Sequence, residues 1–220
     1  MLALLHDGRE KFPMLGWLVD IVAPVRCAAC EAHGAAICKS CATTFAESAP
    51  VTRVAREGAP PVIALGAYAG SLARAVRTIK FGGRRAAALQ LGAQLAASVA
   101  MAADVVVAVP LHAARMRERG FNQAALVAHA LAEGLSLPLI PDALRRAVNT
   151  RAQSTLALDQ RRENVRCAFT SGPHAAHLWD RRVLLVDDVV TTGATLAACV
   201  DAIRESRPRT VIGCALALRI

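Results

Sequence analysis

Two adjacent carboxylates follow an apolar run near the end of the chain. The run is VLLV, and Asp187 and Asp188 come directly after it. An apolar run without alternation predicts a strand that is buried on both faces. Carboxylates at the end of such a strand lie where α/β proteins bind ligands, and they can accept hydrogen bonds from vicinal sugar hydroxyls. The pair therefore indicates a sugar site, since two carboxylates without a partner would be costly.

The turn after the carboxylates has the composition of a phosphate site. It leads into a predicted helix, whose free N–H groups and positive dipole end attract phosphate. The turn contains three hydroxyl donors, Thr191, Thr192 and Thr195. It also contains Gly193, which lets the backbone approach an anion. The spacing and the lysine of a Walker A loop are absent. We expect a sugar phosphate with bound Mg²⁺ here. The alternative is an ordinary strand-turn-helix unit with capping threonines.

A cluster of arginines follows another apolar run. That run, 104–110, ends in proline, and Arg115, Arg117 and Arg119 come soon after it. Because alternate arginines cannot all face one way on a helix, we expect a loop or a frayed turn. Guanidinium groups beside a sugar-phosphate site would suit pyrophosphate. The alternative is a solvated basic loop.

Four cysteines near the start of the chain have the spacing of a metal site. The spacing is C-x2-C-x7-C-x2-C, formed by Cys27, Cys30, Cys38 and Cys41. Two such pairs complete the four ligands of tetrahedral zinc and leave no position for water, so we expect a structural site. A redox role would need only one CxxC pair. A disulfide cluster is not expected in a chain without a secretory signal.

Strands that alternate with helices are expected to position these groups. Apolar runs of this kind predict an α/β fold with a mainly parallel sheet that is flanked by helices. The predicted strands are 62–68, 104–110, 181–188 and 210–218. The predicted helices are 71–80, 84–101, 122–134 and 195–206. The third of them should begin at the N-cap Asn122 and end at the C-cap Gly134.

Composition divides the chain into two parts with a short connection. Residues 1–50 hold the cysteines and an N-terminal amphipathic helix, residues 51–61 are a polar linker, and residues 62–220 form the α/β domain. The net charge of +9 favours anionic partners such as nucleic acid or phosphorylated metabolites, although it can also reflect an arginine-rich surface. No apolar segment is long enough for a membrane span, and we expect a cytoplasmic protein.

The stretch VLLVDDVVTTGAT, residues 183–195, resembles the phosphoribosyl-pyrophosphate (PRPP) signature of type I phosphoribosyltransferases. By this resemblance Asp187 and Asp188 match the pair that binds the ribose hydroxyls. The loop for the 5′-phosphate is matched by Val189, Val190, Thr191, Thr192, Gly193, Ala194 and Thr195. Three further stretches are similar to the ComF family, which joins a four-cysteine zinc module to a phosphoribosyltransferase domain. They are IKFGGRR (79–85), VPLHAARMRERGFNQA (109–124) and RRAVNTRAQSTLALDQRRENVRCAF (145–169).

The resemblance implies a type I phosphoribosyltransferase fold with a small zinc-ribbon-like N-terminal module. It implies structural zinc, Mg²⁺ bound with PRPP, and pentosyl transfer from PRPP with Asp187 and Asp188 as catalytic residues. The further ligand-binding residues that it implies are Lys80, Pro110, Leu111, His112, Arg115 and Arg119. Residues 145–169 are the candidate for a flap that closes over the ligand. The alternative for this segment is a basic helical hairpin.

Two functions are compatible with these features. The ComF family is associated with natural competence, so the resemblance implies a role in handling incoming DNA or in nucleotide metabolism. The alternative is a non-catalytic protein that binds single-stranded DNA through the zinc module and a basic surface, with the competence machinery as partner. Aromatic residues make up only 4% of the chain, so such binding would rest on charge more than on base stacking.

Overall fold

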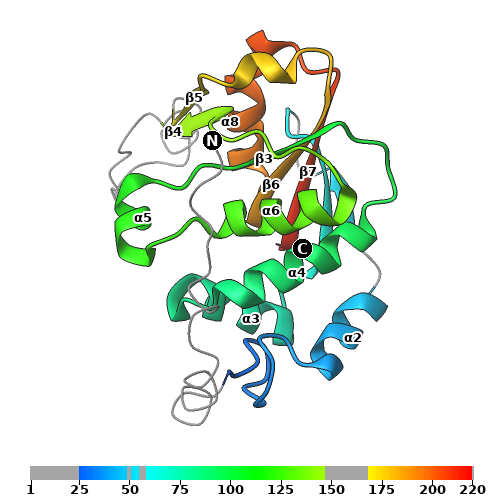
Figure 1. The fold of residues 1–220 in the computed structure, drawn as a ribbon. Coiled ribbons are helices and arrows are strands. Elements are labelled where there is room, and N and C mark those ends of the chain that lie inside the picture. Colours follow the sequence, from blue (N-terminus) through cyan, green and yellow to red (C-terminus); the bar gives the residue numbers. More distant parts are fainter. Residues whose placement is uncertain (1–24, 49–50, 55–57, 147–167, 220) are drawn as a thin grey trace, which may run out of the picture.

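A five-stranded sheet forms the centre of the protein (Figure 1). The computed structural model describes residues 25–48, 51–54, 58–146 and 168–219. The strand order is β1-β2-β7-β6-β3. The strands are β1 (Val51–Val54), β2 (Pro61–Ala67), β3 (Val105–Ala108), β6 (Arg182–Val190) and β7 (Thr210–Leu218). All neighbours pair in parallel except β1, which pairs antiparallel with β2. The predicted mainly parallel sheet is confirmed.

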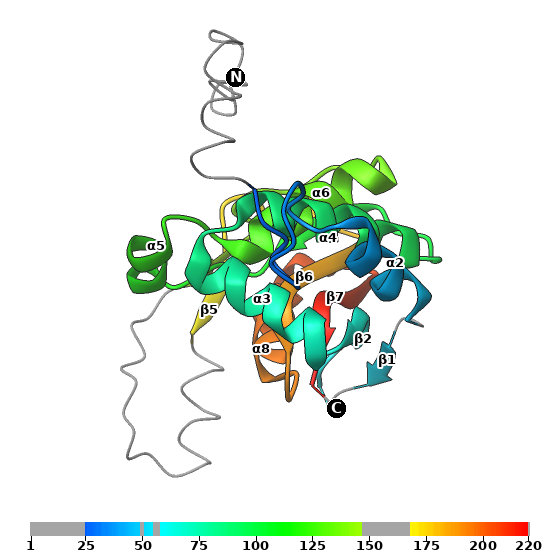
Figure 2. The ribbon, with the colours of Figure 1, turned by 90° about the horizontal axis from the view of Figure 1, so that it is seen from below.

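Helices cover both faces of this sheet (Figure 2). Alternate residues of β6 point to opposite faces, so Leu184 joins one apolar cluster and Leu185 joins the other. The first cluster also holds side chains of α3 (Gly70–Gly82), α4 (Arg85–Ser98) and α6 (Gln123–Leu135). The second cluster holds side chains of α8 (Ala194–Ala202). The apolar strands are therefore enclosed from both sides, which explains why their sequences do not alternate.

Shorter elements complete the described structure. A two-stranded antiparallel sheet consists of β4 (Leu144–Arg146) and β5 (Phe169–Ser171). The remaining helices are α2 (Lys39–Glu47), α5 (Ala113–Arg119) and the 3-10 helices η2 (Ala175–Leu178) and η3 (Arg204–Ser206). None of the helices in the described part of the chain combines the length and the apolar character that a membrane crossing requires.

The cysteine segment packs directly against α3 and α4. Ile37 and Phe45 are buried in the same apolar cluster as Leu91 of α4. Gln90 pairs with the backbone of Ile37, accepting from its N–H and donating to its C=O at 3.0 Å each. Gln94 donates to the carbonyl of Ala42 at 2.6 Å. The segment is thus attached to the domain through its main chain as well as through apolar contacts.

Two sequence-based expectations require correction. Val51–Val54 lie in the segment 51–61 predicted as a linker, but they form the edge strand β1 because they pair along β2. The predicted C-cap Gly134 lies inside α6, which ends at Leu135 with Ser136 in the left-handed conformation. A Cβ at Gly134 would lie 2.7 Å from Cβ of Ala96. The glycine therefore permits close packing of α6 on α4 rather than ending the helix. The predicted N-terminal helix lies outside the described residues.

Candidate functional site

The two carboxylates lie in the last part of β6, on one edge of the sheet. The backbone N–H of Asp188 donates to Oδ1 of Asp187 at 2.8 Å. Nζ of Lys80, which comes from α3, lies 2.8 Å from Oδ1 of Asp188, and both side chains are mostly buried. Burial and the neighbouring charge of Asp188 together raise the pKa of Asp187 to about 7, against the opposing effects of the Asp188 N–H and the charge of Lys80. Among the described residues, Lys80 is the direct ion-pair partner of this acidic pair, and Arg146 adds a positive charge farther away.

The turn beyond the carboxylates ends at Gly193, which is the N-cap of α8. Gly193 has φ 77° and ψ 0°, a left-handed conformation that favours glycine. Four backbone N–H groups of this turn have no hydrogen-bond acceptor in the described part of the chain. They belong to Thr191, Thr192, Gly193 and Thr195. These N–H groups are available to an anion at the N-terminus of a nine-residue helix. A small hollow of about 30 Å³ lies within this turn, lined by residues 189–196 and Asp187.

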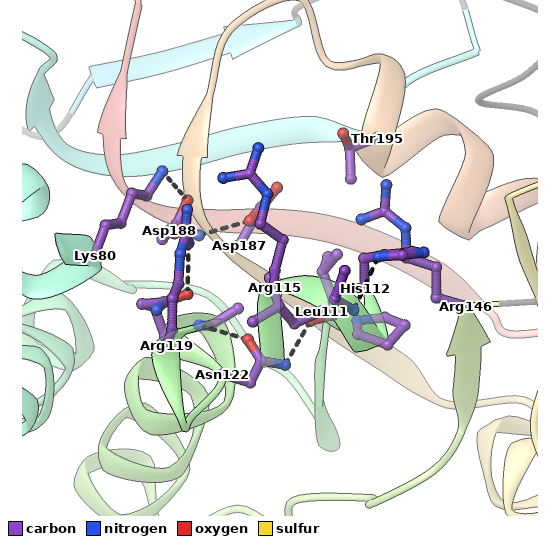
Figure 3. Close-up of a pocket in the computed structure, with 15 residues that line it drawn as sticks. Lys80, Leu111, His112, Arg115, Arg119, Asn122, Arg146, Asp187, Asp188 and Thr195 are labelled. Atoms are coloured by element: carbon purple, nitrogen blue, oxygen red, sulfur yellow. Dashed lines mark hydrogen bonds and ion pairs between the residues drawn. The ribbon is translucent and has the colours of Figure 1, made fainter. Parts of the chain in front are cut away.

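A larger cavity of about 470 Å³ lies beside the hollow (Figure 3). Its lining includes Lys80, Pro110, Leu111, His112, Arg115, Arg119, Asp187, Asp188 and Thr195, all of which the sequence had singled out. Asp187 and Thr195 border both the cavity and the hollow. The structure thus brings the predicted acid pair, the predicted loop and the predicted cations to one place. Their roles in binding stay predictions.

The arginine-rich stretch forms a helix, contrary to the expected loop or frayed turn. It is α5, which begins after the N-cap His112 and ends at Arg119. Nδ1 of His112 accepts a hydrogen bond from the N–H of Ala114 at 3.1 Å, which supports the first turn. Arg115 and Arg119 are four residues apart and both line the cavity, whereas Arg117 does not. The alternation of arginines is therefore compatible with a helix because only two of them face the site.

The four cysteines form a compact cluster away from this cavity. Their sulfur atoms all lie within 4.8 Å of one another. A tetrahedral zinc ion with Zn–S bonds of about 2.3 Å holds its sulfurs about 3.8 Å apart, and Sγ of Cys30 lies 3.6 Å from Sγ of Cys38. Burial opposes ionisation of the Cys27 thiol, but N–H donors of Cys38, Ala29 and Cys30 bring its pKa down to about 6. The cluster therefore fits a metal ion.

Comparison with known proteins agrees with this geometry. The model of the phosphoribosyl transferase domain family matches residues 87–219. The chain belongs to this family. It is 38% identical over 93 residues to competence protein F of Haemophilus influenzae, a match that covers 42% of this chain and 41% of that protein. It is 29% identical over 196 residues to the DNA utilization protein YhgH of Salmonella typhimurium, a match that covers 84% of this chain and 85% of that protein. These relatives and the cysteine cluster identify it as a phosphoribosyl transferase domain protein of the ComF family.

Two further matches complete the comparison. Competence protein ComFC of Bacillus subtilis is 37% identical over 92 residues, which are 42% of this chain and 35% of that protein. Among solved structures, a glutamine PRPP amidotransferase from Bacillus subtilis complexed with ADP and GMP is 23% identical with a TM-score of 0.44. It covers 60% of this chain and 26% of that one. The ComF-family chain spans less than half the length of competence protein F.

Several cavity residues of this ComF-family chain were not in the predicted site. They are Val109, Ala114, Asn122, Gln123, Ala124 and Arg146. Asn122 is the predicted N-cap of α6, since its Oδ1 accepts from the N–H of Ala124 at 3.1 Å, and its Nδ2 also donates to the carbonyl of Val109 at 3.0 Å. Arg146 stands at the start of the segment 145–169 and stacks on Phe169 at 5.1 Å. Residues 147–167 of the predicted flap lie outside the described residues.

Arg146 is an exposed residue of β4, but its charge lies close enough to Asp187 for the two groups to interact. Partial desolvation lowers the pKa of the Arg146 guanidinium, while Cys199 and the charge of Asp187 act to raise it. The sequence drew attention to Arg146 only as one of several arginines in the polar segment 145–169, and it gave no indication of which arginine faces the cavity. The ComF-family domain thus presents four cationic side chains and two carboxylates to one space: Lys80, Arg115, Arg119, Arg146, Asp187 and Asp188.

Proposed function

We propose that the protein binds PRPP, or a related ribose 5-phosphate ligand, together with Mg²⁺. The observation that carries the proposal is that Asp187 and Thr195 border both cavities. A sugar placed at Asp187 would reach the hollow with its 5′-phosphate, where N–H groups that have no acceptor among the described residues could bind an anion. The rest of the ligand would occupy the larger cavity. Ribose 5-phosphate carries both groups that this arrangement would bind, a vicinal diol and a phosphate.

The two carboxylates would bind the ribose hydroxyls. An ionised carboxylate only accepts hydrogen bonds, and a vicinal diol supplies two donors. Lys80 neutralises Asp188 in the absence of a ligand and would be free to turn toward phosphate when the diol takes its place. Mg²⁺ bound to the ligand would offset the remaining charge between the carboxylates and the phosphates. The acid pair thus suits a sugar, and the cations around it suit the phosphates of the same molecule.

Transfer of the phosphoribosyl group is the reaction that this site would support. A nitrogen nucleophile would form a bond to the anomeric carbon as the bond from that carbon to the pyrophosphate oxygen breaks. Pyrophosphate would leave with the electron pair, and the nucleophile would lose its proton to solvent. The side chains of Arg115, Arg119 and Arg146 would stabilise the charge that develops on the leaving group. Catalysis would come mainly from positioning and from this charge stabilisation.

A thermal-shift titration tests ligand binding. PRPP with Mg²⁺ should raise the melting temperature of the wild type, because a ligand that binds only the folded state stabilises it. The double variant Asp187→Ala/Asp188→Ala should lose this response. The matched control is Asp180→Ala/Asp201→Ala, which removes the same charge from residues outside the cavity. If excess PRPP leaves the wild-type melting temperature unchanged, the proposal is wrong. A screen for pyrophosphate release with nucleobases and amines then tests transfer.

A second candidate function is the handling of single-stranded DNA. It is favoured by relatives named competence protein and DNA utilization protein and by the net charge of +9. The exposed ring of Phe81 lies under the guanidinium of Arg119 at 5.2 Å, which provides one stacking surface beside the basic cavity. Affinity for an oligonucleotide measured at two salt concentrations tests it. Binding should weaken steeply with salt, and salt-independent binding would contradict it.

The cysteine cluster is proposed to hold a structural zinc ion. Four thiolates satisfy all positions of tetrahedral zinc, so Cys27, Cys30, Cys38 and Cys41 would hold the ion and leave no site for a substrate. Zinc would fix the loop that packs on α3 and α4. Such thiolates persist where the environment is reducing, which supports the expected cytoplasmic localisation. Elemental analysis of the purified protein tests the metal content.

A further inference from the structure

One side chain of the cavity has a hydrogen-bonding group that the protein leaves unused. Gln123, the first residue of α6, is only 1% exposed and lines the cavity. Its Oε1 accepts from an Nη atom of Arg119 at 3.0 Å. Among the described residues its Nε2 has no acceptor, and Nε of Arg119 is also buried without one. A buried donor without an acceptor costs about 1–3 kcal/mol, so two of them side by side indicate a missing acceptor.

The orientation of the Gln123 amide follows from its neighbour. A guanidinium group only donates hydrogen bonds, so the amide atom that faces Arg119 must be the oxygen. Nε2 is therefore the atom left for another partner. Asn122, the preceding residue, differs because both of its amide atoms are bonded to backbone groups. The structure thus separates a capping side chain from one whose donor remains available in the cavity.

The position of these donors indicates which part of a ligand they would meet. Figure 3 shows Arg119 on the same side of the acid pair as Lys80, with Thr195 on the opposite side. In a ribose ring whose diol is held by the carboxylates, C1 and the C5 arm project to opposite sides. If the 5′-phosphate lies by Thr195, the group on C1 extends toward Arg119 and Gln123. Both the guanidinium and the N-terminus of the 13-residue helix α6 favour an oxyanion there.

We propose that Nε2 of Gln123 and Nε of Arg119 donate hydrogen bonds to oxygen atoms of the pyrophosphate group on C1 of the ligand. This inference rests on the proposed function. It makes Gln123 a specificity-determining residue, because a ligand without an oxyanion on C1 leaves both donors unpaired. Arg119 holds Gln123 in place through the hydrogen bond to Oε1, so that the two side chains act together. The site would thereby distinguish PRPP from ribose 5-phosphate.

The variant Gln123→Glu gives the sharpest test. Glutamate keeps the oxygen that accepts from Arg119 but replaces the free donor with a second acceptor. Gln123→Met is a second variant, which removes the donor and preserves the volume. The control is Gln90→Met, since both amide atoms of Gln90 are bonded to Ile37 and the residue lies outside the cavity lining. Calorimetric titrations with PRPP and Mg²⁺, pyrophosphate and Mg²⁺, and ribose 5-phosphate provide the readout.

We expect both Gln123 variants to bind PRPP and pyrophosphate at least about 10-fold more weakly, because both lose the hydrogen bond from Nε2 and Gln123→Glu also repels the oxyanion. Ribose 5-phosphate should bind them as it binds the wild type, and Gln90→Met should change none of the three affinities. Unchanged binding of PRPP to both Gln123 variants, or an equal loss for ribose 5-phosphate, would overturn the inference while the proposed function stands. A wild type that binds none of the three ligands would contradict the proposed function itself.

Discussion

Lys80 of α3 forms an ion pair with Asp188 of β6, with Nζ 2.8 Å from Oδ1. The two residues come from distant parts of the sequence, and the contact joins the end of a helix to the edge of the sheet where the carboxylates lie. It supplies a positive charge to a pair of acidic side chains that would otherwise repel each other. The same lysine lines the cavity proposed for the ligand. Lys80 can therefore stabilise the acidic pair, and under the proposed function it would also contact a phosphate of the ligand.

Replacing Lys80 should affect both stability and binding. Lys80→Met leaves Asp188 beside Asp187 without its cation, so the melting temperature should fall. Affinity for PRPP with Mg²⁺ should fall by about 10-fold or more, since a hydrogen bond to a charged group is lost. The control is Lys39→Met, an exposed lysine of α2 outside the cavity lining. If Lys80→Met binds PRPP with wild-type affinity, Lys80 contributes to stability and not to ligand binding.

The pH dependence of binding should follow the ionisation of Asp187. Its pKa is raised to about 7, and the diol requires the ionised form. PRPP affinity should therefore be high above pH 7 and should fall by up to about tenfold for each pH unit below it. Titrations across this range with Asp201→Asn as control provide the measurement. A flat profile through neutral pH would mean that Asp187 does not bind the ligand as proposed.

The same raised pKa has the opposite consequence for stability. A carboxyl group whose pKa is higher in the folded state than its unfolded value of about 3.9 binds its proton more tightly when folded. Its contribution to the free energy of unfolding is complete at low pH and is lost as the pH rises through about 7. Asp187→Asn should thus raise the melting temperature above pH 7 while abolishing binding. Equal melting temperatures of variant and wild type at alkaline pH would argue against a raised pKa of Asp187 in the folded protein.

Metal removal should loosen the N-terminal segment. Chelation, or Cys41→Ser, should release the proposed zinc ion and lower the melting temperature, because the cluster fixes a loop that packs on α3 and α4. Metal analysis and thermal denaturation measure the two effects. Cys199→Ala is the control, because this cysteine is buried in α8 outside the cluster. The variant protein should keep its metal even if its stability falls. Retention of full metal content by Cys41→Ser would contradict the predicted ligand set.

The close approach of α4 and α6 should make Gly134 intolerant of a side chain. Gly134→Ala places a methyl group 2.7 Å from Cβ of Ala96, so the helices must separate. We expect a loss of about 1–3 kcal/mol in the free energy of unfolding, as for other overpacked interfaces. In Gly82→Ala, the control on α3, the new methyl group meets only Cγ2 of Thr78 at 3.3 Å. Denaturant unfolding gives the free energy of unfolding of both variants. Equal values would contradict the packing argument.

Local patterns predicted the parallel sheet and most helices because apolar periodicity is a property of neighbouring residues. The acid pair and the turn after it were recognisable for the same reason, since they are contiguous in the sequence. Gln123 and Arg146 were not assigned to the site, because only the tertiary structure shows which polar side chains turn toward the cavity. The arginines of α5 were misjudged through the assumption that all of them serve one site. Gly134 was misjudged because its role depends on Ala96, which belongs to another helix.

The attachment of the cysteine segment to α4 bears on how the protein could be divided for experiments. A chain shortened to begin at residue 62 would expose the apolar surface that Ile37 and Phe45 now cover, and it would leave the amides of Gln90 and Gln94 without their partners. Such a fragment would be prone to aggregate. The two regions should consequently melt in one cooperative transition, so that oxidation of the cysteines would destabilise the α/β domain as well.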